Sequence, residues 1–263
     1  MDLGLQGRRA LVMGGTKGLG RSIADALAEE GAHLVISGRD QGRLDEAAAA
    51  LREKGAASAI GVPGDVANPE DMDRLADAAV KAMGGVDILV LNHGGPPPCT
   101  ALEMQEADLI TWFQRITLSP IRITMRLLPG MRERQWGRII VVGSTGMQHP
   151  IPHLALSNTL RATIWSWLKT LSGEVAKDGV TMNVLAPGSI RTDRTKDTLG
   201  KTAEKRGITM EQAEKESSRE IPAGRFGVPA EYGPMGAFLA SDRGSYITGS
   251  MIRVDGGRVR GML

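Results

Sequence analysis

A serine and an arginine are spaced in the sequence so that their side chains could contact the same bound molecule. Ser157 and Arg161 lie four residues apart in the stretch "LALSNTLRA" (154–162), and Ser144 lies thirteen residues before Ser157. Residues four apart share one face of a helix, so we expect both side chains in the same pocket. A serine hydroxyl orients a carbonyl oxygen but is a poor proton donor, and arginine keeps its proton because its pKa exceeds about 12. The pattern predicts a site that binds an oxygen atom and stabilises negative charge, with the proton supplied by another group.

Three histidines are candidates for that proton donor. His149 and His153 lie in "GMQHPIPHLALS" (146–157), just before Ser157, and His93 lies in "LNHGG" (91–95). A histidine with a pKa of about 6.5 is well matched to proton transfer at neutral pH. The sequence leaves open whether one of these histidines or a water molecule supplies the proton.

A glycine-rich stretch, "VMGGTKGLG" (12–20), follows a short apolar run and precedes a helical pattern. A glycine cluster between a strand and a helix is typical of a phosphate-binding loop. Gly14, Gly18 and Gly20 let the backbone approach a pyrophosphate closely, and the free N–H groups at the start of the helix bind negative charge. The stretch therefore predicts a nucleotide site.

Seven short apolar runs alternate with longer helical patterns along the chain. This alternation is typical of β-α units and predicts a parallel sheet. The expected strands are 9–13, 33–37, 57–62, 86–92, 138–143, 181–186 and 250–255. We therefore expect residues 1–263 to form a single-domain α/β fold of the Rossmann type, a doubly wound, parallel, seven-stranded sheet with helices on both faces.

The interval between the last two expected strands has a different composition. Residues 193–221 are rich in charged side chains and poor in apolar ones, which indicates one or two amphipathic helices. Such a segment is either a lid over a cleft or a solvated excursion of the surface, and the sequence leaves both interpretations open.

The composition excludes several classes of protein. A content of 41% hydrophobic and 24% charged residues is ordinary for a soluble domain, and a formal net charge of +2 gives no strong electrostatic footprint for nucleic acid. One cysteine, Cys99, excludes an intrachain disulfide, and the N-terminal stretch "MDLGLQGRRALVM" has too short an apolar run for a signal peptide or membrane span. We expect a cytoplasmic protein with no nucleic-acid partner, no membrane partner and no metal site.

The glycine spacing resembles that of the short-chain dehydrogenase/reductase family, whose usual motif is T-G-x-x-x-G-x-G, with Met13 in place of the threonine. The stretches "GDV" (64–66), "LNHGG" (91–95), "APGSIRT" (186–192) and "FLASDRGSYITGSMIRVDGG" (238–257) agree with the family in the same order. The resemblance implies a bound dinucleotide, with Asp65 at the adenine and with Ile190 and Thr192 at the carboxamide of the nicotinamide. It implies cofactor contacts at Gly14, Thr16, Lys17, Gly18, Leu19, Gly20, Arg39, Asp65, Val66, Asn92, Gly94, Arg161, Pro187, Gly188, Ile190 and Thr192.

The end of the second expected strand indicates which dinucleotide is bound. Gly38 stands where relatives that prefer NAD carry an acidic residue, and Arg39 follows it. Lys17 adds a second basic side chain at a position where the family discriminates between cofactors. Arginine donates paired hydrogen bonds to phosphate, and lysine adds a point charge. We therefore predict NADP(H).

The catalytic positions depart from the family. Family members hold the substrate carbonyl with a serine, protonate it with a tyrosine, lower the pKa of that tyrosine with a lysine, and complete a proton relay with an asparagine. Ser144 matches the serine, whereas Ser157 replaces the tyrosine, Arg161 replaces the lysine, and Ile116 stands at the asparagine position. We expect Ser144 and Ser157 to hold the oxygen and Arg161 to act in catalysis and to anchor the cofactor.

The resemblance points to an NADPH-dependent oxidoreductase similar to the 3-oxoacyl-(acyl-carrier-protein) reductases, acting on a ketone, an alcohol or an acyl thioester. The altered catalytic residues leave two alternatives open: a nucleotide-binding sensor or partner subunit without redox turnover, and a non-redox lyase or isomerase on the same fold. The C-terminal stretches resemble surfaces through which relatives associate, so we expect a homo-oligomer, either a dimer or a tetramer.

Overall fold

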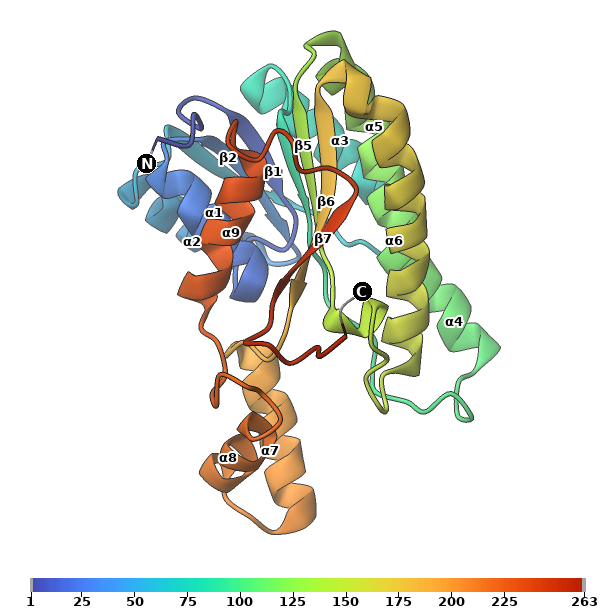
Figure 1. Ribbon diagram of the computed structural model, residues 1–263. Helices are drawn as coiled ribbons and strands as arrows, with labels where there is room; N and C mark the ends of the chain where they lie inside the picture. The colour runs from blue at the N-terminus through green and yellow to red at the C-terminus, as the bar shows by residue number, and fades with distance from the viewer. Residues whose placement is uncertain (1, 262–263) are drawn as a thin grey trace.

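The computed structural model describes residues 2–261, which contain one seven-stranded sheet (Figure 1). The strands are β1 (Arg9–Val12), β2 (His33–Gly38), β3 (Ser58–Pro63), β4 (Ile88–Leu91), β5 (Gly137–Val142), β6 (Val180–Pro187) and β7 (Ser250–Val254). Their order across the sheet is β3-β2-β1-β4-β5-β6-β7, and all neighbouring strands are parallel. The predicted fold class is confirmed, and the observed strand limits differ from the predicted ones by at most two residues.

The strand order places a crevice at the centre of the sheet. From β1 the chain winds outward through β2 and β3, and it then returns to the other side of β1 to form β4. Doubly wound sheets bind ligands at the carboxyl ends of the two strands where the winding reverses. The residues that follow β1 and β4 are therefore the first place to look for a functional site.

Helices cover both faces of the sheet (Figure 1). One layer contains α1 (Gly18–Glu29), α2 (Gln41–Glu53) and α9 (Pro229–Ala240), and the other contains α3 (Pro69–Met83), α5 (Ser119–Glu133) and α6 (Ala155–Val175). Strands covered on both faces need nearly continuous apolar sequence. The strand β4, with the sequence ILVL, meets this condition because all of its residues are buried.

Shorter elements lie around this framework. They are α4 (Glu106–Phe113), a π-helical turn (Gln114–Leu118) and two 3₁₀ turns (Thr145–Met147 and Ala176–Asp178). No helix within residues 2–261 combines the length and the apolar character that a membrane crossing requires.

The predicted helices in residues 193–221 are confirmed as α7 (Asp193–Arg206) and α8 (Met210–Ser218). They project from the sheet below the carboxyl ends of the strands (Figure 1). A small apolar cluster of their own holds them together, formed by Leu199, Ala203, Ala213, Ile221 and Phe226. Their action as a lid stays a prediction.

A buried carboxylate ties three segments together at the opposite end of the sheet. Asp87, which is 5% exposed, accepts hydrogen bonds from Arg9 Nη2 at 2.6 Å, Arg9 Nε at 2.7 Å and Arg134 Nε at 3.2 Å. Burial alone would raise the pKa of Asp87, but the hydrogen bonds and the charge of Arg9 hold it below its ordinary value. Ionised Asp87 therefore stabilises the folded chain.

We expect Asp87→Asn to lower the free energy of unfolding at pH 7 by about 2 to 4 kcal/mol, because it leaves two partly buried guanidinium groups without their counter-ion. The folded-state pKa is depressed, so this contribution is complete above the unfolded pKa of about 3.9 and is lost as the pH falls through the folded value. Urea titrations of both proteins at pH 7 and below pH 4 check this, since the difference must shrink at low pH. Asp73→Asn, which removes the exposed pair of Asp73 with Arg122, is the control and should have a much smaller effect.

Candidate active site

The glycine-rich turn connects the end of β1 to α1 in a backbone conformation that only glycine adopts readily. Gly14 and Gly18 have φ angles of 59° and 62°. A Cβ atom at Gly20 would overlap the carbonyl oxygen of Gly14 and would lie 2.5 Å from Asn92 Nδ2. The turn is therefore as closely packed as the sequence pattern predicts.

The start of α1 is available to an anion. Within residues 2–261, no side chain caps this helix start, and the first turn carries no acidic residue. Unpaired N–H groups and the partial positive charge of a helix N-terminus bind phosphate. Together with the close glycine backbone, this arrangement fits the pyrophosphate of a dinucleotide.

Asn92, directly after β4, holds the turn in place. Its Nδ2 atom donates hydrogen bonds to the carbonyl oxygens of Met13 and Gly14, both at 3.2 Å. Both N–H bonds of the Asn92 amide are used by the glycine-rich turn. The Asn92 side chain therefore contributes to the cofactor site mainly by holding the backbone of that turn in place. Gly94, two residues on, is exposed beside the same crevice.

The predicted adenosine end of the site lies where β2 and β3 end. Gly38 is the last residue of β2, and its carbonyl oxygen accepts a hydrogen bond from Gly64 N at 2.9 Å. Asp65 Oδ1 accepts from Ala67 N at 2.9 Å, which orders the loop that carries Asp65 and Val66. Arg39 is exposed and, among the described residues, its guanidinium group has no hydrogen bond or ion pair. It is therefore free to bind a phosphate.

The segment after β6 faces the glycine-rich turn. A Cβ atom at Gly18 would lie 3.9 Å from Thr192 Cγ2, and Lys17 Nζ lies 3.9 Å from Asp193 Oδ2. Gly188 is close to the chain after β7, because a Cβ atom there would lie 2.6 Å from Asp255 Cα. The predicted contacts from Pro187 to Thr192 thus lie across the crevice from the phosphate turn.

The predicted catalytic residues come together at the end of β5. Ser144 follows this strand by two residues, and its Oγ atom accepts a hydrogen bond from Gly146 N at 3.0 Å. Helix α6 places Ser157 and Arg161 on its buried face, where they are 7% and 6% exposed. Arg161 Nη1 donates to the carbonyl oxygen of Val142 at 2.7 Å. The guanidinium group therefore lies at the end of β5, close to Ser144.

Arg161 keeps its charge at neutral pH. Burial, and next the charge of Arg194, lower the pKa of Arg161 to about 10. In the described part of the chain no carboxylate pairs with it. The end of β5 therefore holds a buried positive charge, which suits stabilisation of an oxyanion.

The three candidate proton donors have different surroundings. His93 is half-buried after β4 with Nδ1 2.8 Å from the carbonyl oxygen of Gly94. Burial, followed by the charges of Arg161 and Arg194, lowers the pKa of His93 to about 3, so it is neutral at pH 7. His149 and His153 are exposed in the loop before α6. His93 therefore carries no ring charge to give up at pH 7, and His149, His153 and water stay open as candidates.

Two other positions define what the site can do. Tyr232 is fully buried, and its OH donates to the carbonyl oxygen of Leu185 at 2.8 Å. Burial raises its pKa, so it cannot replace the missing tyrosine.

Ile116 is buried in the π-helical turn and packs with Leu156 and Leu160. An apolar side chain therefore occupies the position at which the family resemblance expects an asparagine.

Sequence reasoning missed Arg194. A Cβ atom at Gly95 would lie 2.6 Å from Arg194 Nη2, so this guanidinium group reaches from α7 to the loop after β4. Arg194 lies in the first turn of α7, where the helix dipole disfavours a cation. A cation in the first turn of a predicted helix is the sequence feature that could have identified Arg194 as a candidate functional residue.

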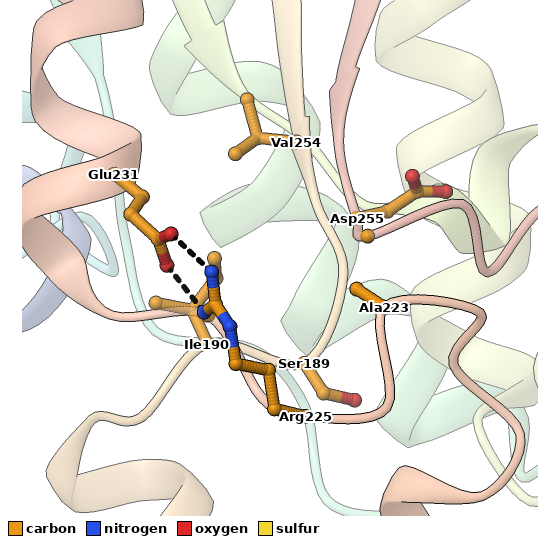
Figure 2. Close-up of a pocket in the computed structure, with 9 residues that line it drawn as sticks. Ser189, Ile190, Ala223, Arg225, Glu231, Val254 and Asp255 are labelled. Carbon is orange, nitrogen blue, oxygen red and sulfur yellow. Dashed lines mark hydrogen bonds and ion pairs between the residues drawn. The ribbon is translucent and has the colours of Figure 1, made fainter.

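Figure 2 shows a small pocket behind Ile190, where the α7–α8 excursion leaves and rejoins the sheet. The ion pair between Arg225 and Glu231, with distances of 2.6 and 2.9 Å, closes one side of it. Ile190, which is one of the predicted site residues, lines this pocket. The pocket marks the base of the predicted lid, and its lining does not include Ser144 or Ser157.

Comparison with known proteins assigns the chain to a family. Residues 14–258 match the family model described as enoyl-(acyl carrier protein) reductase. The chain is 34% identical over 255 residues to a 3-oxoacyl-(acyl-carrier-protein) reductase of Vibrio cholerae serotype O1, a match that covers 97% of this chain and 98% of the relative. It is 34% identical over 261 residues to D-beta-hydroxybutyrate dehydrogenase of Cupriavidus necator, with 97% of this chain and 99% of the relative covered.

Solved structures agree with this assignment. L-sorbose reductase from Gluconobacter frateurii, determined with NADPH and L-sorbose, superimposes with a TM-score of 0.95 at 33% identity, covering 100% of both chains. YwfH, described as an NADPH-dependent reductase involved in bacilysin biosynthesis, superimposes with a TM-score of 0.92 at 28% identity, covering 98% of this chain and 100% of YwfH.

Proposed function

The chain belongs to the short-chain dehydrogenase/reductase family, and we propose on this basis that it is an NADPH-dependent oxidoreductase that reduces a carbonyl group to an alcohol. The observation that carries the proposal is the buried Arg161 guanidinium at the end of β5, two residues before Ser144, in a sheet whose glycine-rich turn follows β1. The turn, the bare start of α1 and the unpaired Arg39 support NADP(H) as the cofactor. When bound, NADPH supplies the hydride.

The protein's own residues then have distinct roles. Ser144 and Ser157 donate hydrogen bonds to the substrate oxygen and hold the carbonyl carbon towards the cofactor. Arg161 stabilises the negative charge that develops on that oxygen, and it also anchors the cofactor. Because Arg161 keeps its proton and His93 is neutral, we propose that the proton reaches the product oxygen from water.

A change of charge at Arg39 tests the cofactor assignment. We expect Arg39→Asp to weaken NADPH binding about 10- to 100-fold, because the 2′-phosphate loses a charged hydrogen bond and meets a carboxylate. The affinity for NADH should not fall. Fluorescence titration of both nucleotides measures the two dissociation constants.

The matched control is Lys81→Asp, which makes the same change of charge on α3, away from the crevice. NADPH affinity should be unchanged in this variant. Equal NADPH affinity in Arg39→Asp and in the wild-type protein would contradict the assignment of Arg39 to the 2′-phosphate.

We further propose that the substrate is a small molecule with a ketone or an acyl thioester group, and that the protein is a cytoplasmic homo-oligomer. Association is supported by the exposed apolar side chains on and near α4 and α5, Leu102, Ile110, Leu118 and Met125. It is also supported by β7, which lies at the edge of the sheet. Light scattering gives the mass in solution, and a monomer would contradict this part of the proposal.

A further inference from the structure

Two arginine side chains converge on the catalytic crevice without a carboxylate to balance them. Arg161 comes from α6 and Arg194 from α7, and between them the loop after β4 carries His93 and Gly95. Arg161 Nη1 donates to the carbonyl oxygen of Val142 at the end of β5, and the guanidinium group of Arg194 lies against Gly95 in the loop after the neighbouring strand β4. The charges of both arginines lower the pKa of His93 in the same loop. In residues 2–261 neither guanidinium group has an ion-pair partner.

Arg161 differs from Arg138, the other arginine that is buried within residues 2–261. The guanidinium group of Arg138 lies 3.8 Å from the carboxylate of Asp242. In the same residues, the side chain of Arg161 has only the carbonyl oxygen of Val142 as a partner, through Nη1. Burying a charge without a counter-ion is costly, so such a group usually has one that binds from outside.

Arg194 reaches the crevice from the opposite wall. Its guanidinium group rests against Gly95, and burial lowers its pKa although the residue as a whole is exposed. No hydrogen bond to its side chain occurs within the described chain. Its place in the first turn of α7 is unfavourable for a cation unless an anion lies in front of it.

We propose that Arg194 binds the carboxylate of the substrate, with the positive charge of Arg161 nearby, and that the substrate is a small oxo acid. This inference rests on the proposed function and restricts the substrate of that reaction to small acids that carry an oxo group. The planar, multiply donating guanidinium group matches the two oxygens of a carboxylate. An acyl thioester has no such group beside its carbonyl.

The position of the carboxylate follows from α6. Ser157, which holds the reacting oxygen, and Arg161 are one helical turn apart, with Cβ atoms separated by about 5 to 6 Å in such pairs. Both side chains lie on the same buried face of α6, so a carboxylate near Arg161 belongs to a small substrate whose acid group is close to its carbonyl, as in a 2-oxo or 3-oxo acid.

The phosphates of the cofactor are the other anions that could use Arg194. The glycine-rich turn and the start of α1 already suit the pyrophosphate, and Arg39 and Lys17 suit the 2′-phosphate. Arg194 contacts Gly95, three residues beyond Asn92 in the loop after β4. This placement favours the substrate over the cofactor.

The test uses the full chain saturated with NADP⁺ for binding or with NADPH for reduction, and two matched pairs of probes: 4-methyl-2-oxopentanoate and 3-oxobutanoate, each with its neutral methyl ester. Calorimetry measures binding of the four probes to the NADP⁺ complex, and absorbance measures reduction by the NADPH complex. We expect at least one acid to bind about 10-fold or more tightly than its ester. Arg194→Gln should remove this preference, leaving the affinity for the ester and for NADPH within about twofold.

Lys196→Gln, which removes one positive charge from the same helix, is the control and should keep the preference for the acid. The inference is overturned if no acid binds more tightly than its ester, or if Arg194→Gln weakens NADPH and leaves the preference intact, since Arg194 would then be a cofactor ligand. Either result leaves NADPH binding by the wild-type protein in place. Failure of the wild-type protein to bind NADPH would instead contradict the proposed function itself.

Discussion

Arg161→Met should reduce kcat for carbonyl reduction by about 100-fold or more, with the chain still folded. Removal of one donor to a developing oxyanion typically costs about 10²- to 10³-fold, and Arg161 is a buried cation at the end of β5, where Ser144 follows two residues later. Methionine fills much of the same volume without the charge. Steady-state kinetics with a ketone substrate, together with a thermal melt, measure the effect.

Lys169→Met is the control, because it removes a cation from the exposed side of the same helix. Its kcat should match that of the wild-type protein. If Arg161→Met also retained kcat within about twofold, the guanidinium group would have no part in the chemistry.

The double variant Ser157→Tyr with Arg161→Lys asks whether proton delivery limits the rate. It restores the pair of residues that the family normally uses, and a positioned general acid contributes about 10²- to 10⁴-fold. We expect a rise in kcat of at least about 10-fold for a simple ketone. An unchanged kcat would mean that a tyrosine at position 157 does not assist the reaction in this crevice, so proton delivery from that position does not limit the rate.

Gly20→Ala should abolish measurable NADPH binding. The added Cβ atom would overlap the carbonyl oxygen of Gly14 and crowd Asn92 Nδ2 at 2.5 Å, and the backbone of the turn cannot move away without losing both hydrogen bonds from Asn92. We expect the affinity to fall by about 100-fold or more, as the phosphate loses several backbone N–H donors at once. Fluorescence titration measures this loss.

The same substitution at Gly173, in α6, is the matched control, because nothing lies within 4 Å of a Cβ atom there. Gly173→Ala should bind NADPH normally and should be slightly more stable, since alanine favours a helix. If Gly20→Ala bound NADPH as tightly as Gly173→Ala, the turn would not be the phosphate site.

The sheet was predictable from the sequence because parallel strands covered on both faces must be short, continuous apolar runs, as in β4 and β5. The glycine-rich turn was predictable for a similar reason. Its positions are constrained by backbone contacts within a few residues, as at Gly14 and Gly18. Local patterns therefore predict local geometry.

The charge distribution of the crevice was not predictable in this way. His93, Arg161 and Arg194 follow three different strands, and they meet only because β4, β5 and β6 are neighbours in the sheet. The pKa of His93 is lowered by burial and by the charges of these two arginines. A histidine that is well matched to neutral pH in the sequence is therefore uncharged in the folded protein. The π-helical turn around Ile116 was also missed, because it interrupts the helical period over only a few residues.

Transfer of deuterium from NADPH labelled at C4 is the decisive measurement for the proposed reductase. The purified protein is incubated with each C4-labelled epimer of NADPH and with 3-oxoacyl thioesters, 2-oxo acids and 3-oxo acids, and the alcohols are analysed by mass spectrometry. We predict that one epimer delivers deuterium to the former carbonyl carbon of at least one product, and that Arg161→Met nearly abolishes this transfer. Tight binding of NADPH with no label in any product would contradict a reductase and would leave a nucleotide-binding protein without redox turnover.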